Sequence, residues 1–148
     1  MLNIATLTEE FVNRNEGLKE ALHDKGRPHG IVMLKVNNLN FAIPLRSNLN
    51  HRFSVVLDKV KRDGKTLKIG LDFTKAVLIR DVDTDVGKTY IVPKSQKATL
   101  VKRKKMIISQ FNKYVREYIG ACERGAKHTL DSQYKFSTLV NYHVELDI

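Results

Sequence analysis

The residues best suited to chemistry lie in two short polar loops. One loop precedes the first expected long strand and contains Lys25 and Arg27, and the other follows the next strand and contains Ser47 and His51. RNA carries its own nucleophile, the 2′-OH. A protein that cuts RNA therefore needs only to remove that proton, protonate the leaving 5′-oxygen and stabilise the charge on the phosphate. Lysine, arginine, serine and histidine suit these tasks, so the two loops are typical of RNA cleavage without a metal ion.

Each of these residues also has a simpler explanation. Ser47 can cap its own turn, as serine commonly does in polar loops. His51 can be an exposed loop histidine, and Arg27, beside Pro28 and two glycines, can be an ordinary surface arginine. A loop arginine bracketed by chain breakers is nevertheless well placed to bind phosphate, and the ordinary titration range of histidine suits proton transfer near neutral pH.

Charge is the strongest feature of the composition. The 148 residues hold 26 Lys+Arg against 16 Asp+Glu, a formal net charge of +10. Residues 25–121 alone carry 21 basic and 7 acidic side chains, and residues 86–116 carry nine basic side chains and no acid. Ordinary solvated helices mix both signs, because like charges repel. A surface of one sign is expected to bind a polyanion, and nucleic acid is the first expectation.

Several other chemistries are not expected. The single cysteine, Cys122, excludes an internal disulfide and a cysteine-rich zinc site. The five histidines show no i,i+4 pair, and the chain has no glycine-rich phosphate loop and no Gly-x-Ser-x-Gly motif. We therefore expect no cofactor and no metal. Without a long apolar run or a secretory signal, we also expect a cytoplasmic protein without membrane contact.

The hydrophobic pattern predicts one domain, over residues 1–148, of class α+β. A first helix is expected from residue 8 to 17 or 22, followed by strands at 31–36 and 40–44 that are joined by Asn37-Asn38. The strand is expected to end, or to reach a sheet edge, at Pro44, because proline cannot donate to a ladder.

The second half of the chain continues the sheet and adds a long helix. Strands are expected at 53–60, 66–69, 76–79 and 90–92, and the helix runs from an N-cap at Ser95 to a C-cap at Gly125. Asp81, Asp83, Asp85 and Gly87 match the start of a calcium loop. Val92 stands where that loop needs a glutamate, so a surface loop is expected instead. Residues 132–148 fit either a strand or a short helix.

Four segments together resemble a known family. The four segments are Gly30-Ile-Val-Met-Leu, Asn40-Phe-Ala-Ile-Pro-Leu-Arg-Ser-Asn-Leu-Asn-His51, Gly70-Leu-Asp-Phe-Thr-Lys-Ala-Val-Leu-Ile79 and Tyr134-Lys-Phe-Ser-Thr-Leu-Val-Asn-Tyr-His143. In this order they are similar to the type III toxin–antitoxin endoribonucleases of the ToxN/AbiQ group, and most of all to its TenpN branch. Each segment alone is a weak motif.

The resemblance implies a fold and a function. The fold would be a twisted antiparallel sheet that forms a half-open barrel, with an N-terminal helix and a long helix in the C-terminal half. The function would be metal-independent RNA cleavage that leaves 2′,3′-cyclic phosphate ends. A small structured RNA antitoxin, often a pseudoknot, would inhibit the enzyme within a cyclic protein–RNA assembly, and related members defend bacteria against phages.

The resemblance also assigns residues. Ser47 matches the family's active-site serine, although Arg46 precedes it and Asn48-Leu49 follow where some relatives have threonine and lysine. The lysine role would move to His51 or Arg52, and Lys25 and Arg27 are alternatives for the basic residue before the first long strand. In this interpretation Arg27 or Lys25 stabilises the phosphate, Ser47 binds a non-bridging oxygen, and His51 carries the proton.

Further residues are expected to bind RNA through their charge or their place in the resembling segments: Arg46, Arg52, Lys61, Arg62, Lys65, Lys102, Arg103, Lys104, Lys105, Lys113, Arg116, Ser137, Thr138 and His143. Two classes of function remain open from the sequence. One is an RNA-cutting toxin, and the other is a basic RNA- or DNA-binding module without catalysis.

Overall fold

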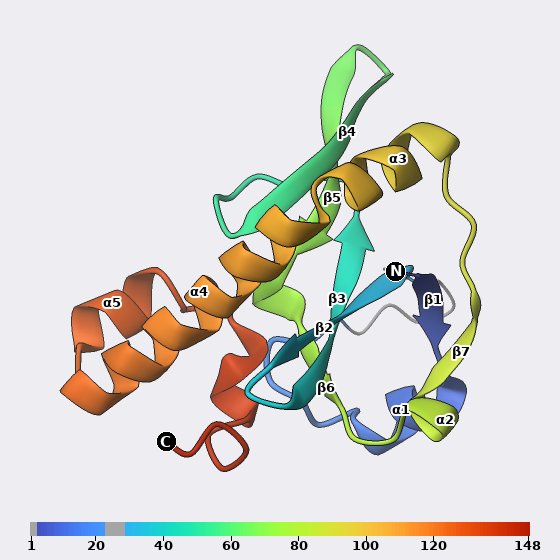
Figure 1. Ribbon diagram of the computed structural model, residues 1–148. Helices are drawn as coiled ribbons and strands as arrows, with labels where there is room; N and C mark the ends of the chain where they lie inside the picture. Colours follow the sequence, from blue (N-terminus) through green and yellow to red (C-terminus); the bar gives the residue numbers. More distant parts are fainter. Residues whose placement is uncertain (1–2, 23–28) are drawn as a thin grey trace.

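The chain folds as an antiparallel sheet with helices packed against it, and the class is α+β as expected. A computed structural model describes residues 3–22 and 29–148 (Figure 1). The strands are β1 (Ile4–Leu7), β2 (Ile31–Val36), β3 (Leu39–Arg46), β4 (Ser54–Arg62), β5 (Lys65–Asp72), β6 (Val77–Ile79) and β7 (Val86–Thr89). The helices are α1 (Glu9–Arg14), α2 (Val82–Asp85), α3 (Lys94–Lys102), α4 (Lys104–Arg124) and α5 (Lys127–Ser132), with 3₁₀ turns η1 (Phe73–Lys75) and η2 (Thr138–Asn141).

The sheet is open rather than a closed barrel. Its strand order is β4-β5-β3-β2-β1-β7, and β6 pairs with β3 outside this path. All pairs are antiparallel. The expected twisted sheet, N-terminal helix and long helix in the C-terminal half are therefore confirmed.

Strand β3 is the centre of the sheet because it has three partners. β2 pairs along it from Leu39 to Pro44, while its other edge pairs first with β6 at residues 40–42 and then with β5 at residues 45–46. The Leu45 N–H donates to Gly30 O of the β2 side at 2.8 Å, so residue 44 faces the other edge, in the gap between β6 and β5. Pro44 therefore breaks no ladder, and β3 continues past it to Arg46.

Apolar side chains cover both faces of the central strands. On one face, Phe111 of α4 packs edge-on against Phe41 of β3 with ring centroids 5.6 Å apart. On the other face, Phe11 of α1 joins a smaller cluster with Ala42 and Ile79. Because β3 is covered on both faces, its consecutive residues 41–45 are all buried. Strands of this kind are hydrophobic without the alternation of a half-exposed strand.

The long helix expected from Ser95 to Gly125 is interrupted. Arg103 leaves helical geometry (φ −99°, ψ 11°) between α3 and α4, and its Nη1 donates to Val56 O of β4 at 3.0 Å. The expected N-cap at Ser95 is also wrong, because α3 begins at Lys94 and Pro93 is its N-cap residue. The expected C-cap is confirmed, since Gly125 has φ 63° in the left-handed region.

The two ends of the chain differ from the expectation in detail. The first helix is shorter than predicted and is capped by Thr8, whose hydroxyl accepts from the Phe11 N–H. The strand expected at 90–92 lies instead at 86–89, where β7 pairs with the unpredicted β1. Residues 132–148 contain η2 and no strand, so the helical alternative was the better one.

The Asp-x-Asp-x-Asp segment is a structural turn. Asp81 caps α2 by accepting a hydrogen bond from the Asp83 N–H at 3.0 Å, and Asp85 is buried in an ion pair with Arg14 of α1.

Within the described residues, no helix is long and apolar enough to cross a membrane.

Gly70 gives a direct test of this packing. A Cβ at Gly70 would lie 1.9 Å from Val55 O of the neighbouring strand, so backbone would have to move to accept it. We expect Gly70→Ala to lower the free energy of unfolding by about 2 kcal/mol or more. Gly17→Ala is the control, because a Cβ at Gly17 meets nothing within 4 Å. Equal midpoints for both variants in urea would contradict the close approach of β4 to β5.

Candidate functional site

The strongest candidate site lies where β3, β4 and β5 meet at one end of the sheet. Arg46 is the last residue of β3, and Ser47 follows it in an exposed bend. Leu49 is buried, and its N–H donates to Lys68 O of β5 at 3.0 Å, which ties the loop to the sheet. Ser47 is thereby presented to solvent by a loop that is fixed at both sides.

Asp72, at the end of β5, is the buried centre of this site. Its side chain has no solvent exposure. Its Oδ2 accepts from Arg46 Nη1 at 2.9 Å, and its Oδ1 accepts from the Thr74 hydroxyl at 2.6 Å and from the Thr74 N–H at 3.0 Å. The Nε2 atom of His51 lies 3.0 Å from the same Oδ1. One carboxylate therefore holds the two residues that flank the Ser47 loop.

These contacts keep Asp72 ionised. Burial by itself would raise the pKa of Asp72. The Thr74 side chain, the Arg46 guanidinium and the nearby His51 outweigh burial and hold that pKa below its usual value. Arg46 is 38% exposed, so part of its donor fork remains accessible to solvent.

His51 is held on both sides of its ring. Its Nδ1 accepts from the Phe53 N–H at 3.1 Å, so Nδ1 carries no proton in this arrangement. Its Nε2 is buried at the short contact with Asp72 and makes no well-aligned hydrogen bond within the described part of the chain. Both nitrogens face protein, which favours a positioning role for His51 over the expected role of proton carrier.

His29 is a site residue that sequence reasoning missed. Its Nδ1 lies 3.3 Å from Leu45 O, and a carbonyl only accepts, so Nδ1 is the protonated nitrogen. In this tautomer Nε2 is the nitrogen without a proton. Because β2 and β3 are antiparallel, residue 29 lies beside the chain that leads into Arg46 and Ser47. The signal that could have found it is its place in the first polar loop, directly before Gly30, where the first resembling segment begins.

Asp72, Thr74 and Lys75 were also missed as individual residues, although they lie inside a resembling segment. Asp-x-Thr is a local signal for a side-chain-capped turn, and here it caps η1. The Lys75 amine donates to Glu20 O at 2.7 Å and to Phe136 O at 2.9 Å. Burial lowers the pKa of Lys75, and the neighbouring Glu20 and Asp72 partly oppose this effect.

The remaining predicted catalytic residues, Lys25 and Arg27, lie outside the described residues, so their assignment stays a prediction. Arg52 belongs to the same loop as His51. Its guanidinium lies 4.6 Å from the centroid of the Phe53 ring, and its side chain is exposed.

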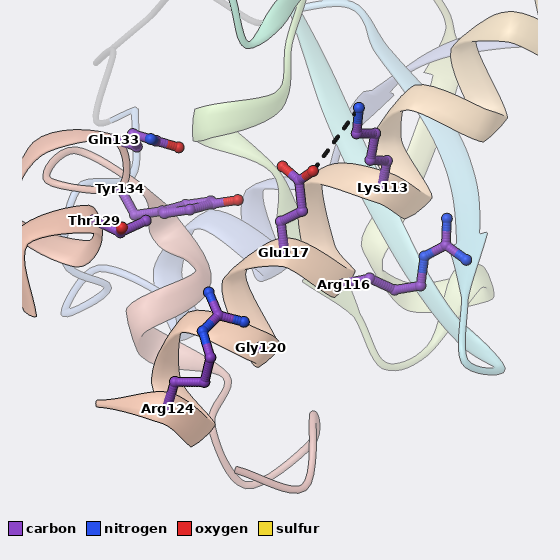
Figure 2. A pocket seen from close by; sticks show the side chains of 8 residues that line it. All are labelled: Lys113, Arg116, Glu117, Gly120, Arg124, Thr129, Gln133 and Tyr134. Atoms are coloured by element: carbon purple, nitrogen blue, oxygen red, sulfur yellow. Dashed lines mark ion pairs between the residues drawn. The ribbon is translucent and has the colours of Figure 1, made fainter. Parts of the chain in front are cut away.

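The predicted RNA-binding lysines and arginines fall on three surfaces. Lys61, Arg62 and Lys65 are exposed near the turn of the β4–β5 hairpin, which projects from the body of the protein (Figure 1). A second group surrounds the junction of α3 and α4: Lys102, Arg103, Lys104 and Lys105. Lys113 and Arg116 line a pocket between α4 and α5 (Figure 2).

Two groups of this prediction need correction. Arg103 is partly buried and uses its guanidinium on Val56 O and Met106 Sδ, so it acts chiefly in the fold. Ser137 and Thr138 are 1% and 0% exposed and bind Tyr114 and Ala76 O inside the core. They therefore do not line a groove. His143 is half-buried, with Nε2 2.5 Å from the Tyr118 hydroxyl.

Comparisons with protein-family models, with curated proteins and with solved structures each gave no match. In the described part of the chain, no group of three or more His, Cys, Asp and Glu residues is placed to hold a metal ion. The site therefore has to be interpreted from its own geometry.

Asp72→Asn tests whether the buried carboxylate supports the fold. We expect the variant to lose about 2–4 kcal/mol of stability at pH 7, because the charge of Arg46 loses its partner and the contact with His51 is disturbed. Asp131→Asn on α5 is the exposed control. Stability is measured by urea unfolding.

The same pair of proteins gives a pH test. Asp72 binds its proton less readily in the folded protein than in the unfolded chain, so its ion pair stabilises the fold above about pH 4. That stabilisation disappears as the pH falls through the lower pKa of the folded state. Wild type and Asp72→Asn should converge in stability on acidification, and a gap that stays constant from pH 7 to pH 2.5 would contradict this assignment.

Proposed function

We propose that this protein is an endoribonuclease that cuts RNA by using the 2′-OH of its substrate, without a metal ion. One observation carries the proposal: the buried Asp72 holds both Arg46 and His51, which lie one residue before and four residues after the exposed Ser47. A partly exposed guanidinium that is held in place next in sequence to an exposed serine is suited to bind a phosphodiester.

The reaction assigns a role to each group. The 2′-oxygen attacks phosphorus, a new P–O2′ bond forms and the P–O5′ bond breaks. The leaving 5′-oxygen takes up a proton from water, so the products are a 2′,3′-cyclic phosphate and a free 5′-OH. Arg46 and the Ser47 hydroxyl stabilise the charge on the non-bridging oxygens. His29 is our candidate for the base that takes the proton of the 2′-OH, because it lies beside the chain that leads into Arg46 and Ser47, and Lys25 or Arg27 remains the expected second phosphate ligand.

The charge of the protein supports RNA as the substrate. Cationic side chains occupy the β4–β5 hairpin and the α3–α4 junction, and such surfaces bind phosphates without sequence preference. The resemblance of four segments extends the proposal to a toxin that is inhibited by a structured RNA antitoxin in a cyclic assembly. This extension rests on the resemblance alone.

A second candidate is a basic RNA-binding module without catalysis. The arrangement of His51 favours it, because a histidine with both nitrogens turned to protein cannot readily exchange protons with a substrate. The two candidates share the same basic surfaces and differ only in the chemistry at Ser47 and His29.

Cleavage in EDTA separates the two candidates. Purified wild-type protein is incubated with a mixed RNA, and the 3′ ends of the products are analysed for cyclic phosphate. We expect cleavage to proceed in EDTA. Ser47→Ala and Arg46→Gln should each lower the rate about 10²–10³-fold, as loss of one oxyanion contact does. His29→Gln should lower it about 10²–10⁴-fold, as loss of a general base does.

Matched controls define the result. Ser109→Ala on α4 and Arg80→Gln after β6 change the same residue types at exposed positions outside the expected RNA-binding surfaces, and both should cleave within a few-fold of wild type. Each variant is also checked by thermal unfolding. RNA that stays intact with wild-type protein, but is bound, would favour the non-catalytic module. Cleavage that survives Ser47→Ala in a folded protein would place the site elsewhere.

The α3–α4 junction gives a separate prediction about binding. Replacing Lys102, Lys104 and Lys105 by glutamine, with Arg103 kept for the fold, should flatten the slope of log Kd against log salt by about 2 if all three lysines contact phosphates. Lys88→Gln on β7 is the control and should leave the slope unchanged. An unchanged slope in the triple variant would mean that this junction is only a solvated face.

A further inference from the structure

The pocket between α4 and α5 is not explained by the chemistry at Ser47. It has a volume of about 550 Å³, within the range of pockets that take small ligands, and its walls come from α4, from α5 and from the segment after α5 (Figure 2). The ligand that we assign to this pocket rests on the proposed function, because RNA is taken as the molecule that the protein binds.

Positive charge dominates the α4 wall of the pocket. Lys113, Arg116 and Arg124 line this wall together with a single carboxylate, Glu117. Glu117 lies 3.9 Å from Lys113 Nζ, so these two charges largely offset each other. Arg116 and Arg124 have no ion pair within the described residues. Two arginines that face a pocket without a carboxylate partner are suited to an external anion, and the planar guanidinium fork matches a phosphate.

A glycine inside α4 shapes the floor of the pocket. Gly120 lies inside the 21-residue helix α4, four residues before its end, where glycine costs about 1 kcal/mol relative to alanine. A Cβ at this position would lie 3.0 Å from Arg124 Nη1. The Arg124 guanidinium therefore folds back over the bare helix backbone (Figure 2), and the absence of a side chain keeps both the arginine and the pocket open.

The opposite wall is neutral and polar. Thr129 and Gln133 supply a hydroxyl and an amide, which can donate and accept hydrogen bonds. Tyr134 lies behind them, and its hydroxyl donates to Tyr114 O in the core at 2.9 Å. Burial raises the pKa of Tyr134 to about 12, so it adds no charge to this wall at neutral pH.

A chain of stacked groups connects the pocket with the loop that carries Ser47. The Tyr134 ring stacks on Phe53 with centroids 5.8 Å apart. The Arg52 guanidinium lies over the same Phe53 ring, one residue from His51. Tyr134 of the pocket and Arg52 of the candidate catalytic loop thus contact the same aromatic ring. A strand of RNA that crosses Ser47 can continue along Arg52 toward α4.

We propose that this pocket binds one unpaired nucleotide of the RNA strand next to the cleaved bond. Arg116 and Arg124 hold its phosphate, and Gln133 and Thr129 hydrogen-bond its base or sugar. A pocket of this kind fixes the strand at a set distance from Ser47, and it selects single-stranded RNA because a nucleotide within a duplex cannot enter it.

The test uses RNA that cannot be cut. A single-stranded oligonucleotide with 2′-O-methyl groups is titrated with wild-type protein, Arg124→Gln, Gly120→Met and Lys88→Gln, and binding is followed by fluorescence anisotropy. We expect Arg124→Gln to weaken binding about tenfold and Lys88→Gln to leave it within twofold of wild type.

Gly120→Met separates a blocked pocket from a damaged fold. Methionine fills the pocket without changing the charge, and it is a better helix former than glycine. We expect weaker binding, by about tenfold, together with a melting temperature equal to or above that of wild type. Weak binding in a protein that melts earlier would be attributed to unfolding, so Arg124→Gln then decides the question.

The outcomes distinguish this inference from the proposed function. If Gly120→Met and Arg124→Gln both bind the oligonucleotide like wild type, the pocket does not hold RNA, whether or not wild-type protein cleaves. If both variants bind weakly while wild-type protein binds RNA but never cleaves it, the pocket assignment stands and the catalytic proposal fails. Equal weakening toward a stable RNA duplex would overturn the selection for an unpaired nucleotide.

Discussion

The buried carboxylate of Asp72 is the interaction on which the candidate site depends. A charged group without solvent contact is costly unless it is hydrogen-bonded and paired, and here Thr74 and Arg46 donate to it while His51 lies in short contact with it. These partners come from three places: the end of β3, the loop after it, and the 3₁₀ turn that follows β5. The requirement to satisfy one carboxylate therefore fixes the direction of Arg46 and the course of the loop that exposes Ser47. The sheet also brings Arg46 next to the strand that carries Asp72, because β3 changes partner from β6 to β5 just before it reaches Arg46.

Much of the sheet was predictable, and the reasons are local. The β2–β3 turn uses Asn37 and Asn38 at φ 51° and 63°, and the β4–β5 turn uses Asp63 and Gly64 at φ 51° and 74°, as turns of this kind require. The break at Arg103 was not predictable, because its cause is a hydrogen bond to Val56, 47 positions away. In the same way, sequence reasoning found the Ser47 loop from its composition but missed Asp72, whose partners Arg46 and His51 are remote in sequence. It expected Ser137 and Thr138 to bind RNA because of their place in a resembling segment, whereas tertiary packing turned both hydroxyls inward.

The distribution of charge gives the site its context. The β4–β5 hairpin and the α3–α4 junction present lysines that are suited to general attraction of a polyanion, and such contacts are sensitive to salt. The α4–α5 pocket differs from them because its arginines stand in a defined cavity, beside polar side chains and next to the aromatic group under Arg52. In this account the lysines raise affinity, the pocket sets the position of the strand, and Arg46, Ser47 and His29 act on the bond. This division explains why removal of one lysine should matter little while removal of one arginine should matter more.

The central claim is that RNA binds across the loop held by Asp72, and the ring signals of the histidines in wild-type protein test it most directly. The protein, with its histidine rings isotopically labelled, is titrated with a 2′-O-methyl RNA while the imidazole resonances are recorded by NMR. His29 contacts Leu45 O just before the Ser47 loop and His51 contacts Asp72 at the other end of that loop, whereas His143 is packed against Tyr118. The expected result is that the His29 and His51 resonances shift in step with saturation while the His143 resonance stays in place. Saturable binding that moves neither His29 nor His51 would contradict the account.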